Sequence, residues 1–380
     1  MLQTMRNAWK IDDLRHKILF TLVIILLYRL GNAVPVPYVN IDALNSYFAQ
    51  MQNTVLGLLN VMSGGAFSNA TIFALSIQPY INASIIIQLL CIAIPALERM
   101  SKEEGEEGKK KIASITRYTT VAIGLIQGFA YYYMIMKSGF LTADGQGVWA
   151  AIVIILTFTS GSALIMWLGE RITDKGVGNG ISFIILIGII ARLPGAFIEE
   201  FMGRISSAQG GLVMLVIEIV LLFAVILGAV LLVQGTRKVP VQYAKRIVGN
   251  KQYGGARQYI PLKVNAAGVM PIIFAQAIMF IPLTLAGFGS RGEASSIVKA
   301  LTNMEGFWYN FIYFLMIVAF TYFYTAITVR PTQMSEDMKR NNGFIPGVKP
   351  GKKTADYLDS IMSRITLPGS IFLGIVAIMP

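Results

Sequence analysis

Long apolar stretches alternate with short polar ones along the whole chain. Those apolar enough to cross a membrane as helices are predicted at 18–35, 71–95, 112–136, 148–168, 180–194, 211–234, 268–288 and 308–328. A ninth apolar stretch begins after Thr366 and reaches Pro380 before it attains the roughly 20 residues that a crossing needs. The pattern predicts an all-α polytopic membrane protein with about nine spans, the last of them incomplete.

Polar side chains interrupt the second of these stretches, 71–95, although it carries no charge. On a helix, Gln78, Ile81, Asn82, Ile85 and Gln88 fall within a sector of roughly 120°. Polar groups at membrane depth normally face protein or water, because lipid cannot satisfy their hydrogen bonds. This helix is therefore a candidate wall of an aqueous path. The alternative is that its amides only hold neighbouring helices together.

The segment just before it, 56–70, is rich in Gly and Ser and only mildly apolar. It is too weak to cross a bilayer alone, which predicts a re-entrant or half-helix segment.

Composition excludes a soluble globular protein, since 55% of the residues are hydrophobic, 14% are charged and the mean hydropathy is +0.61. Cys91 and His16 are the only residues of their types. They cannot build a disulfide framework or a cysteine or histidine metal cage, so we expect no metal and no cofactor. The leader 1–17 is polar and amphipathic, which predicts a helix on the membrane surface rather than a cleavable signal.

Basic residues gather in alternate loops and predict the orientation. All but six of the 32 Lys and Arg residues lie in the leader, near the loops at 96–111 and 169–179, or in the long loops 235–266 and 329–366. By the positive-inside rule these segments and the amino terminus are cytoplasmic. The halves 18–205 and 206–380 then start on opposite sides of the membrane, which predicts an inverted repeat with the pathway between the halves.

Two further features, the glycines at 176–180 and Glu218, have a structural interpretation beside a functional one. The glycines at 176–180 lack the Lys-Ser/Thr of a phosphate loop and predict a tight turn into the fifth span. Glu218 is the one acid inside a predicted span, which makes it a candidate functional group. It lies about two helical turns from the external end, so it could equally reach the interface.

Four long motifs, in this order, resemble the SecY family, the channel subunits of the bacterial protein translocon. They are SGGAFSNATIFALSIQPYINASIIIQLL at 63–90, GERITDKGVGNGIS at 169–182, LKVNAAGVMPIIFA at 262–275 and GFIPGVKPGKKTADYLDSIMSRIT at 343–366. The resemblance covers essentially the whole chain. It implies a ten-span inverted-repeat clamshell around an hourglass pore in the bacterial cytoplasmic membrane, which passes unfolded secretory polypeptides and is not an enzyme.

The resemblance also implies roles for particular residues. A short helical plug at about 59–70 would close the pore, through Leu59, Asn60, Met62, Ser63, Gly64, Gly65 and Phe67. An aliphatic pore ring would comprise Ile81, Ile85, Ile181, Ile185 and Ile273. A lateral gate between spans 2/3 and 7/8 would include Ile86, Gln88, Gln127, Gln276 and Ile281, and would release transmembrane segments into lipid.

The long cytoplasmic loops suit an acidic partner, nucleic acid or anionic lipids. Loop 235–266 has no acid and alternates as a protruding hairpin does, while loop 329–366 presents Lys349 on a Pro-Gly turn. The alternative is that both loops only set topology. The resemblance implies the partners SecE, SecG, the motor SecA, the ribosome and signal-bearing preproteins. The implied docking residues are Lys245, Arg246, Lys251, Arg257, Arg340, Lys349 and Lys352.

Two departures from the family pattern stand out. Lys349 occupies a position where the family usually has Arg, which keeps the charge and loses the bidentate fork. The tenth span, with the sixth ring residue, would lie beyond Pro380. The rival hypothesis is an inverted-repeat secondary transporter of a small solute, but such proteins usually couple to ions through acids near the midplane.

Overall fold

The computed structural model describes residues 9–50, 57, 60–61, 63–102, 105–191, 193–206, 211–243, 246–248, 251–253, 257–276, 278–279 and 306–379. They form two compact units, Met1–Gly203 and Arg204–Pro380. Within the described ranges, six helical stretches are long and apolar enough to cross a membrane. They are Gly105–Lys137, Val148–Lys175, Gly180–Ile205, Val213–Gln234, Phe307–Arg340 and Lys352–Ile378.

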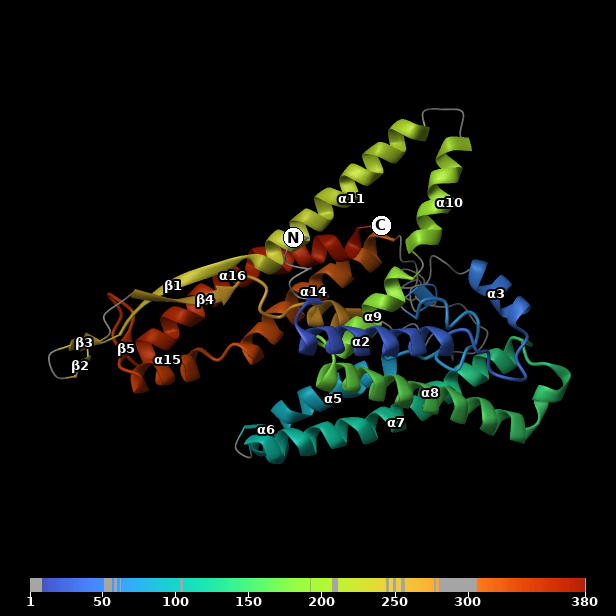
Figure 1. The fold of residues 1–380 in the computed structure, drawn as a ribbon, viewed down its shortest axis with the longest axis horizontal. Coiled ribbons are helices and arrows are strands. Elements are labelled where there is room, and N and C mark those ends of the chain that lie inside the picture. The colour runs from blue at the N-terminus through green and yellow to red at the C-terminus, as the bar shows by residue number, and fades with distance from the viewer. Residues whose placement is uncertain are drawn as a thin grey trace. The chain divides into compact units, whose positions relative to one another are not determined.

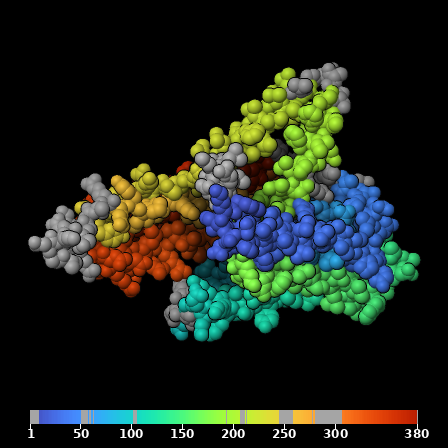
Figure 2. All heavy atoms as spheres, in the orientation of Figure 1, coloured from blue at the N-terminus to red at the C-terminus, as the bar shows by residue number. Residues whose placement is uncertain are grey.

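The first unit is a helical bundle (Figure 1). Its elements are α2 (Asp12–Gly31), α3 (Ile41–Gln50), α5 (Gln78–Ala93), α6 (Pro95–Lys102), α7 (Gly105–Lys137), the 3₁₀ turn η1 (Ala143–Gln146), α8 (Val148–Lys175), α9 (Gly180–Ile190) and most of α10 (Leu193–Ser206). Helix α7 packs along both α5 and α8, and α8 also contacts α2 and α9. In the space-filling view, the atoms of α7 and α8 adjoin along the lower face (Figure 2).

Glycines let α8 and α9 approach closely. A Cβ at Gly180 would lie 2.0 Å from the carbonyl oxygen of Gly169, so neither helix could hold its place with a larger residue there. The predicted tight turn before α9 is confirmed, with Gly178 at a φ of +71°. The carboxamide of Asn179 then caps the helix by accepting hydrogen bonds from the amides of Ile181 (3.1 Å) and Ser182 (3.2 Å).

The second predicted span is wrong at its start. Thr71 forms an isolated β-bridge with Pro35, residues 72–77 form turns rather than helix, and α5 begins only at Gln78. Ser76 has a φ of +50°, a left-handed conformation that a right-handed helix cannot include. Pro79 in the first turn of α5 needs no hydrogen bond for its nitrogen, which favours a helix start there. At the other end Ile94 is extended before Pro95, as a residue preceding proline prefers.

The second unit contains helices and a small sheet. Its elements are α11 (Gly211–Gln234), β1 (Thr236–Tyr243), β2 (Arg246–Val248), β3 (Lys251–Tyr253), β4 (Arg257–Lys263), α14 (Phe307–Thr328), α15 (Pro331–Arg340), β5 (Gly343–Phe344) and α16 (Lys352–Ile378). Strand β1 pairs antiparallel with β4 from Thr236↔Lys263 to Gln242↔Arg257, so the predicted hairpin is confirmed. The fold is mostly helical, and the described strands lie within the two long predicted loops.

These two loops share one core. Strand β1 also pairs with β5, giving the sheet order β4-β1-β5, and α15 packs on α16. The core between them consists of Val239, Val241, Leu262, Met338, Ile345, Leu358 and Met362. The predicted loop 329–366 is therefore largely ordered structure, because burying these apolar side chains stabilises it. Its last part is the beginning of α16, which continues through the ninth apolar stretch.

Glu218, the acid predicted inside a span, forms an ion pair with Arg204 of α10. Both side chains are about one-third exposed, with 34% for Arg204 and 36% for Glu218. The ion pair with Arg204 therefore explains how the Glu218 carboxylate is accommodated in an otherwise apolar helix.

Candidate functional site

The polar and isoleucine-bearing face of α5 is divided by burial. Ile81 and Ile85, which lie one turn apart, are only 6% and 7% exposed. Asn82 and Ser84 are half-buried, whereas Gln88 is exposed and donates a hydrogen bond to the Ser84 hydroxyl at 3.4 Å. The two isoleucines thus lie on the enclosed side of the helix, and the amide nearest its end remains accessible.

The other predicted ring residues differ in their surroundings. Ile181 and Ile185 are half-buried in α9, where Ile184 is the residue that is fully packed, at 1% exposure. A Cβ built at Gly169 of α8 would lie 3.1 Å from Ile181 and 3.4 Å from Ile184. Ile273 belongs to the second unit, in a helical segment at 270–276, and is also half-buried.

The segment predicted as a plug, 59–70, is helical at Asn60 and Val61 and turns from Ser63 onward. The half-helix prediction is therefore wrong for 63–70, and Leu59 and Met62 lie outside the described residues. Side chains close these turns internally. Asn60 accepts at its carboxamide oxygen from the amide of Ser68 (2.9 Å), and the Ser63 hydroxyl accepts from the amide of Phe67 (3.1 Å).

Most described residues of this segment are buried, although Val61 is 38% exposed. Asn60 is 6% exposed, Ser63 2% and Phe67 7%. Polar side chains that leave water so fully must find partners inside the protein, and the internal hydrogen bonds supply them. The Gly and Ser content makes the segment a poor membrane span. It also allows tight turns whose polar groups form hydrogen bonds within the segment.

Parts of the chain outside the plug segment hold its carboxyl-terminal end. The amide of Val36 donates to the carbonyl of Ala70 (2.9 Å), and the amide of Ile72 donates to the carbonyl of Val34 (3.0 Å). The side-chain amide of Asn45 in α3 donates to Asn69 at 2.8 Å. These bonds fix the part of the chain from Asn69 to Ile72 to the loop after α2 and to α3.

Phe67 enters the core of the first unit. Its ring stacks on Tyr131 of α7 at a centroid distance of 4.3 Å and packs edge-on against Phe48 of α3 at 5.2 Å. Tyr131 also packs against Phe158 of α8 at 5.0 Å. Tyr131 was not singled out from the sequence. The run of three tyrosines at 131–133 inside an apolar span is the signal that could have found it.

The predicted lateral-gate residues on α5 are more exposed than Ile81 and Ile85 of the same helix. Ile86 of α5 is 42% exposed and Gln88 is exposed, while Gln127 of α7 and Gln276 of the second unit are half-buried. Ile281 lies outside the described residues. Since α5 and α7 pack directly on each other, the described gate residues of the first unit occur on neighbouring helices.

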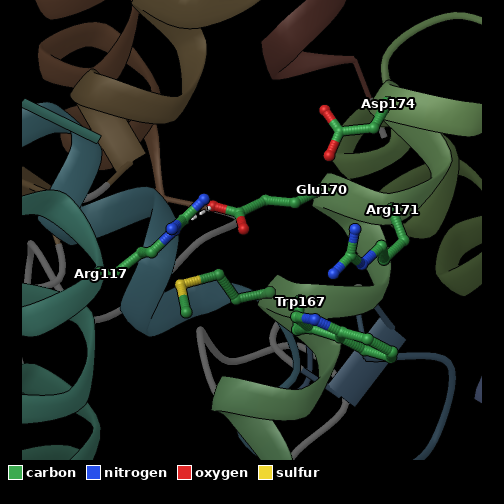
Figure 3. Close-up of a pocket in the computed structure, with 6 residues that line it drawn as sticks. Arg117, Trp167, Glu170, Arg171 and Asp174 are labelled. Atoms are coloured by element: carbon green, nitrogen blue, oxygen red, sulfur yellow. Dashed lines mark hydrogen bonds and ion pairs between the residues drawn. The ribbon is translucent and has the colours of Figure 1, made fainter. Parts of the chain in front are cut away.

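A polar niche lies at the ends of α7 and α8 that the charge pattern assigns to the cytoplasm (Figure 3). Arg117 of α7 donates from Nε to Glu170 of α8 at 2.9 Å, and the guanidinium of Arg171 lies 5.2 Å from the centre of the Trp167 ring. Asp174 and Met166 complete the lining. The sequence motif 169–182 contained three of these charges, but only the packing of α7 on α8 brings Arg117 to them.

The predicted docking residues fall into two groups. Arg340, Lys349 and Lys352 are exposed on the second unit. The backbones of Arg246, Lys251 and Arg257 lie in strands β2, β3 and β4, and Lys245 is outside the described residues.

The turn that carries Lys349 is rigid. Gly347 and Gly351 have φ values of +86° and +96°, which only glycine adopts readily. The Thr354 hydroxyl donates to the carbonyl of Lys349 (3.0 Å), and the Ser335 hydroxyl donates to the carbonyl of Gly351 (2.7 Å). The structure therefore holds one exposed cation at the tip of a braced turn.

No cluster of three or more His, Cys, Asp or Glu residues that could hold a metal occurs in the part of the chain that the structure describes. The side chains described in this section are mainly apolar, amide, hydroxyl and basic groups, with the carboxylates of Glu170 and Asp174 in the niche of α7 and α8. Such a set can line a path, seal it and bind a partner.

Known proteins resemble this chain throughout. A family model described as SecY matches residues 71–380. The protein translocase subunit SecY of Mycobacterium tuberculosis is 42% identical over 400 residues, covering 100% of this chain and 89% of the relative. The subunit of the same name from Aquifex aeolicus is 38% identical over 387 residues, with the same two coverages.

Solved structures share the fold at lower identity. One concerns the plug domain of the SecY protein and the closed state of the translocation channel; it has a TM-score of 0.61 and 17% identity, covering 96% of this chain and 85% of that one. Another is Sec61 in the canine ribosome–channel complex from the endoplasmic reticulum. It has a TM-score of 0.59 and 15% identity, with coverages of 95% and 84%.

Proposed function

This chain belongs to the SecY family of protein translocase subunits, and on that basis we propose that it forms a channel for unfolded secretory polypeptides. It is a multi-pass membrane protein with several apolar helices. The channel acts by binding and gating, with no covalent step of its own. The transporter hypothesis loses its support, since no relative reported above is a solute carrier and the one acid predicted inside a span is paired with Arg204.

The observation that carries the proposal is the combination of α5 with the plug segment. Ile81 and Ile85 are buried on one face of a helix that also carries amide side chains. The segment before this helix is largely buried and forms hydrogen bonds within itself. Branched apolar side chains at a constriction repel water and ions yet yield to an extended polypeptide. Ile181, Ile185 and Ile273 are proposed to complete this ring, and the segment 59–70 to close it at rest.

Sideways release into lipid is proposed to occur between spans 2/3 and 7/8. The supporting observation is the exposure of Ile86 and Gln88 on α5, next to α7. A polypeptide segment that is apolar enough would leave the path for lipid by the hydrophobic effect, and a polar one would stay. Gln127, Gln276 and Ile281 are proposed to line the same gate.

Members of the family are translocon subunits, and the solved structures that resemble this chain include a ribosome-bound channel. Both observations support the binding of a ribosome or a motor protein to the cytoplasmic loops. We assign that role to the braced basic turn at Lys349, with Arg340 and Lys352, and to the hairpin that carries Lys245, Arg246, Lys251 and Arg257. SecA is proposed as the motor and SecE and SecG as companions. No residue of helix α11 from Val213 to Gln234 is buried, so this helix offers apolar surface for a partner helix or lipid.

The proposed location is the bacterial cytoplasmic membrane, with the amino terminus and the basic loops in the cytoplasm. Anionic lipids would add to the attraction at those loops.

The test is transport into sealed vesicles. The chain is reconstituted with SecE and SecG, and SecA, ATP and an unfolded precursor are added outside. The proposal expects the precursor to become resistant to external protease, and to be digested again once detergent opens the vesicles. Vesicles that lack the chain are the control. Persistent protease sensitivity, with the assembled complex present, would refute a protein-conducting role.

A further inference from the structure

Arg29 is the one charged residue in the apolar stretch 18–35, and it is half-buried near the end of α2. A cation at this depth is costly in lipid and normally marks a functional contact. Arg29 belongs neither to the proposed pore ring nor to the plug segment.

Its guanidinium binds the end of α9. One nitrogen, Nη2, donates a hydrogen bond to the carbonyl of Ile187, which also accepts from the amide of Ala191 at 3.2 Å. The last carbonyls of a helix carry partial negative charge, so a cation there is favoured. Arg29 thus ties α2 to the helix that carries Ile181 and Ile185.

The second nitrogen faces the plug segment. A Cβ built at Gly64 would lie 3.4 Å from Nη1 of Arg29 and 3.0 Å from the carbonyl oxygen of Gly188. Gly64 and Gly65 have φ values of +67° and +89°, so this turn is one that glycine alone makes without strain. The turn at Gly64 therefore rests against both Arg29 and α9.

We propose that Arg29 is a positioning residue that seats the plug by holding α9 and the Gly64 turn together at the end of α2. The inference rests on the proposed channel function and names the contact that couples a pore-ring helix to the plug. When α9 moves away from α2, the Arg29–Ile187 hydrogen bond breaks. Arg29 and Gly188, against which the Gly64 turn rests, then move apart. The chain from Asn69 to Ile72 stays bound to the loop after α2 and to α3.

The test uses the assembled translocon in planar bilayers, without substrate. Arg29→Gln removes the charge and the fork, so the resting ion conductance is expected to rise roughly tenfold, as loss of one charge-assisted hydrogen bond predicts. Arg29→Lys keeps the charge and is expected to restore part of the seal. Lys137→Gln, which removes an exposed cation that lies over the Tyr133 ring at the end of α7, is the matched control and is expected to leave conductance at the wild-type level.

A second readout separates seating from folding. A weakened seat favours precursors with defective signals, so Arg29→Gln should raise their transport relative to a normal precursor, whereas a misfolded channel lowers both. Gly64→Ala strains the same turn from the plug side and should leak as well. Because both changes act on one contact, the double variant should leak less than the product of the two single effects.

The inference is overturned if Arg29→Gln channels, assembled at wild-type levels, show wild-type conductance and an unchanged transport ratio. Failure of the wild-type complex to transport any precursor would instead refute the proposed function, so the two outcomes are distinguishable.

Discussion

The phenol of Tyr131 in α7 donates a hydrogen bond to the main-chain carbonyl of Phe67, and the two aromatic rings stack at an interplanar angle of 24°. A long apolar helix is thus joined to the turn segment that precedes α5. Tyr131 is 4% exposed and Phe67 7%, so the joint is inside the first unit. This hydrogen bond and ring contact are among the interactions that hold at rest a segment proposed to move during transport.

Removing that hydrogen bond should loosen the segment measurably. Tyr131→Phe keeps the ring stack, and the Phe67 carbonyl still accepts from the amide of Ala70, so a loss of about 1 kcal/mol is expected. Tyr131→Ala also leaves a cavity and should cost about 3–5 kcal/mol. Thermal unfolding of the purified complex in detergent measures both, with the exposed Tyr118→Phe as control. Equal melting temperatures for wild type and Tyr131→Ala would contradict the packing described.

Polar substitution in the ring should open a path for ions. Ile85 is 7% exposed, and Ile85→Asn replaces an apolar branch with an amide that attracts water. We expect higher resting conductance in planar bilayers and transport of precursors with weak signals. Ile85→Leu keeps an apolar side chain of similar volume and should remain sealed. Unchanged conductance in the asparagine variant would remove Ile85 from the ring.

Close approach of α8 to the chain before α5 depends on Gly161. A Cβ at this position would lie 2.0 Å from the carbonyl oxygen of Ile72, and a backbone atom cannot step aside as a flexible side chain can. Gly161→Ala should therefore cost about 3 kcal/mol, the upper end for overpacking. Gly203→Ala in α10, which meets no atom within 4 Å, is the matched control and should be neutral or stabilising. Melting temperature and steady-state abundance in membranes report the difference.

The braced turn predicts salt-dependent docking. Lys349→Glu reverses an exposed charge without touching the glycines, so affinity for SecA or for ribosomes should fall several-fold at about 0.1 M salt and differ little at about 1 M. Lys109→Glu reverses an exposed charge on α7, in the first unit, and should have a smaller effect. Binding measured by flotation of vesicles with bound partner distinguishes the two. Equal affinities at low salt would leave the turn without a docking role.

The ion pair at the niche of α7 and α8 should contribute little to stability. Arg117 is 51% exposed and Glu170 22%, and partly exposed pairs typically contribute about 0–1 kcal/mol. Glu170→Gln should therefore lower the melting temperature only slightly, and less in high salt. A loss as large as that of Tyr131→Ala would show that water screens the pair far less than its exposure indicates.

Apolar length and the distribution of Lys and Arg were enough to predict the membrane class, the order of most spans and the basic loops, because apolar length sets a crossing and Lys and Arg set its direction. The resemblance to the family rests instead on the four long motifs. It also predicted the hairpin of β1 and β4 and the tight turn before α9, since alternation and glycine spacing are short-range signals.

The folded structure was needed to establish where α5 begins, that the two long loops share one core, and which side chains hold the plug segment. The start at Gln78 depends on a left-handed Ser76, which hydropathy cannot reveal. Tyr131 reaches Phe67 across 64 residues and Arg29 reaches Ile187 across 158. Contacts between residues so far apart in the chain arise from packing, so no local pattern contains them.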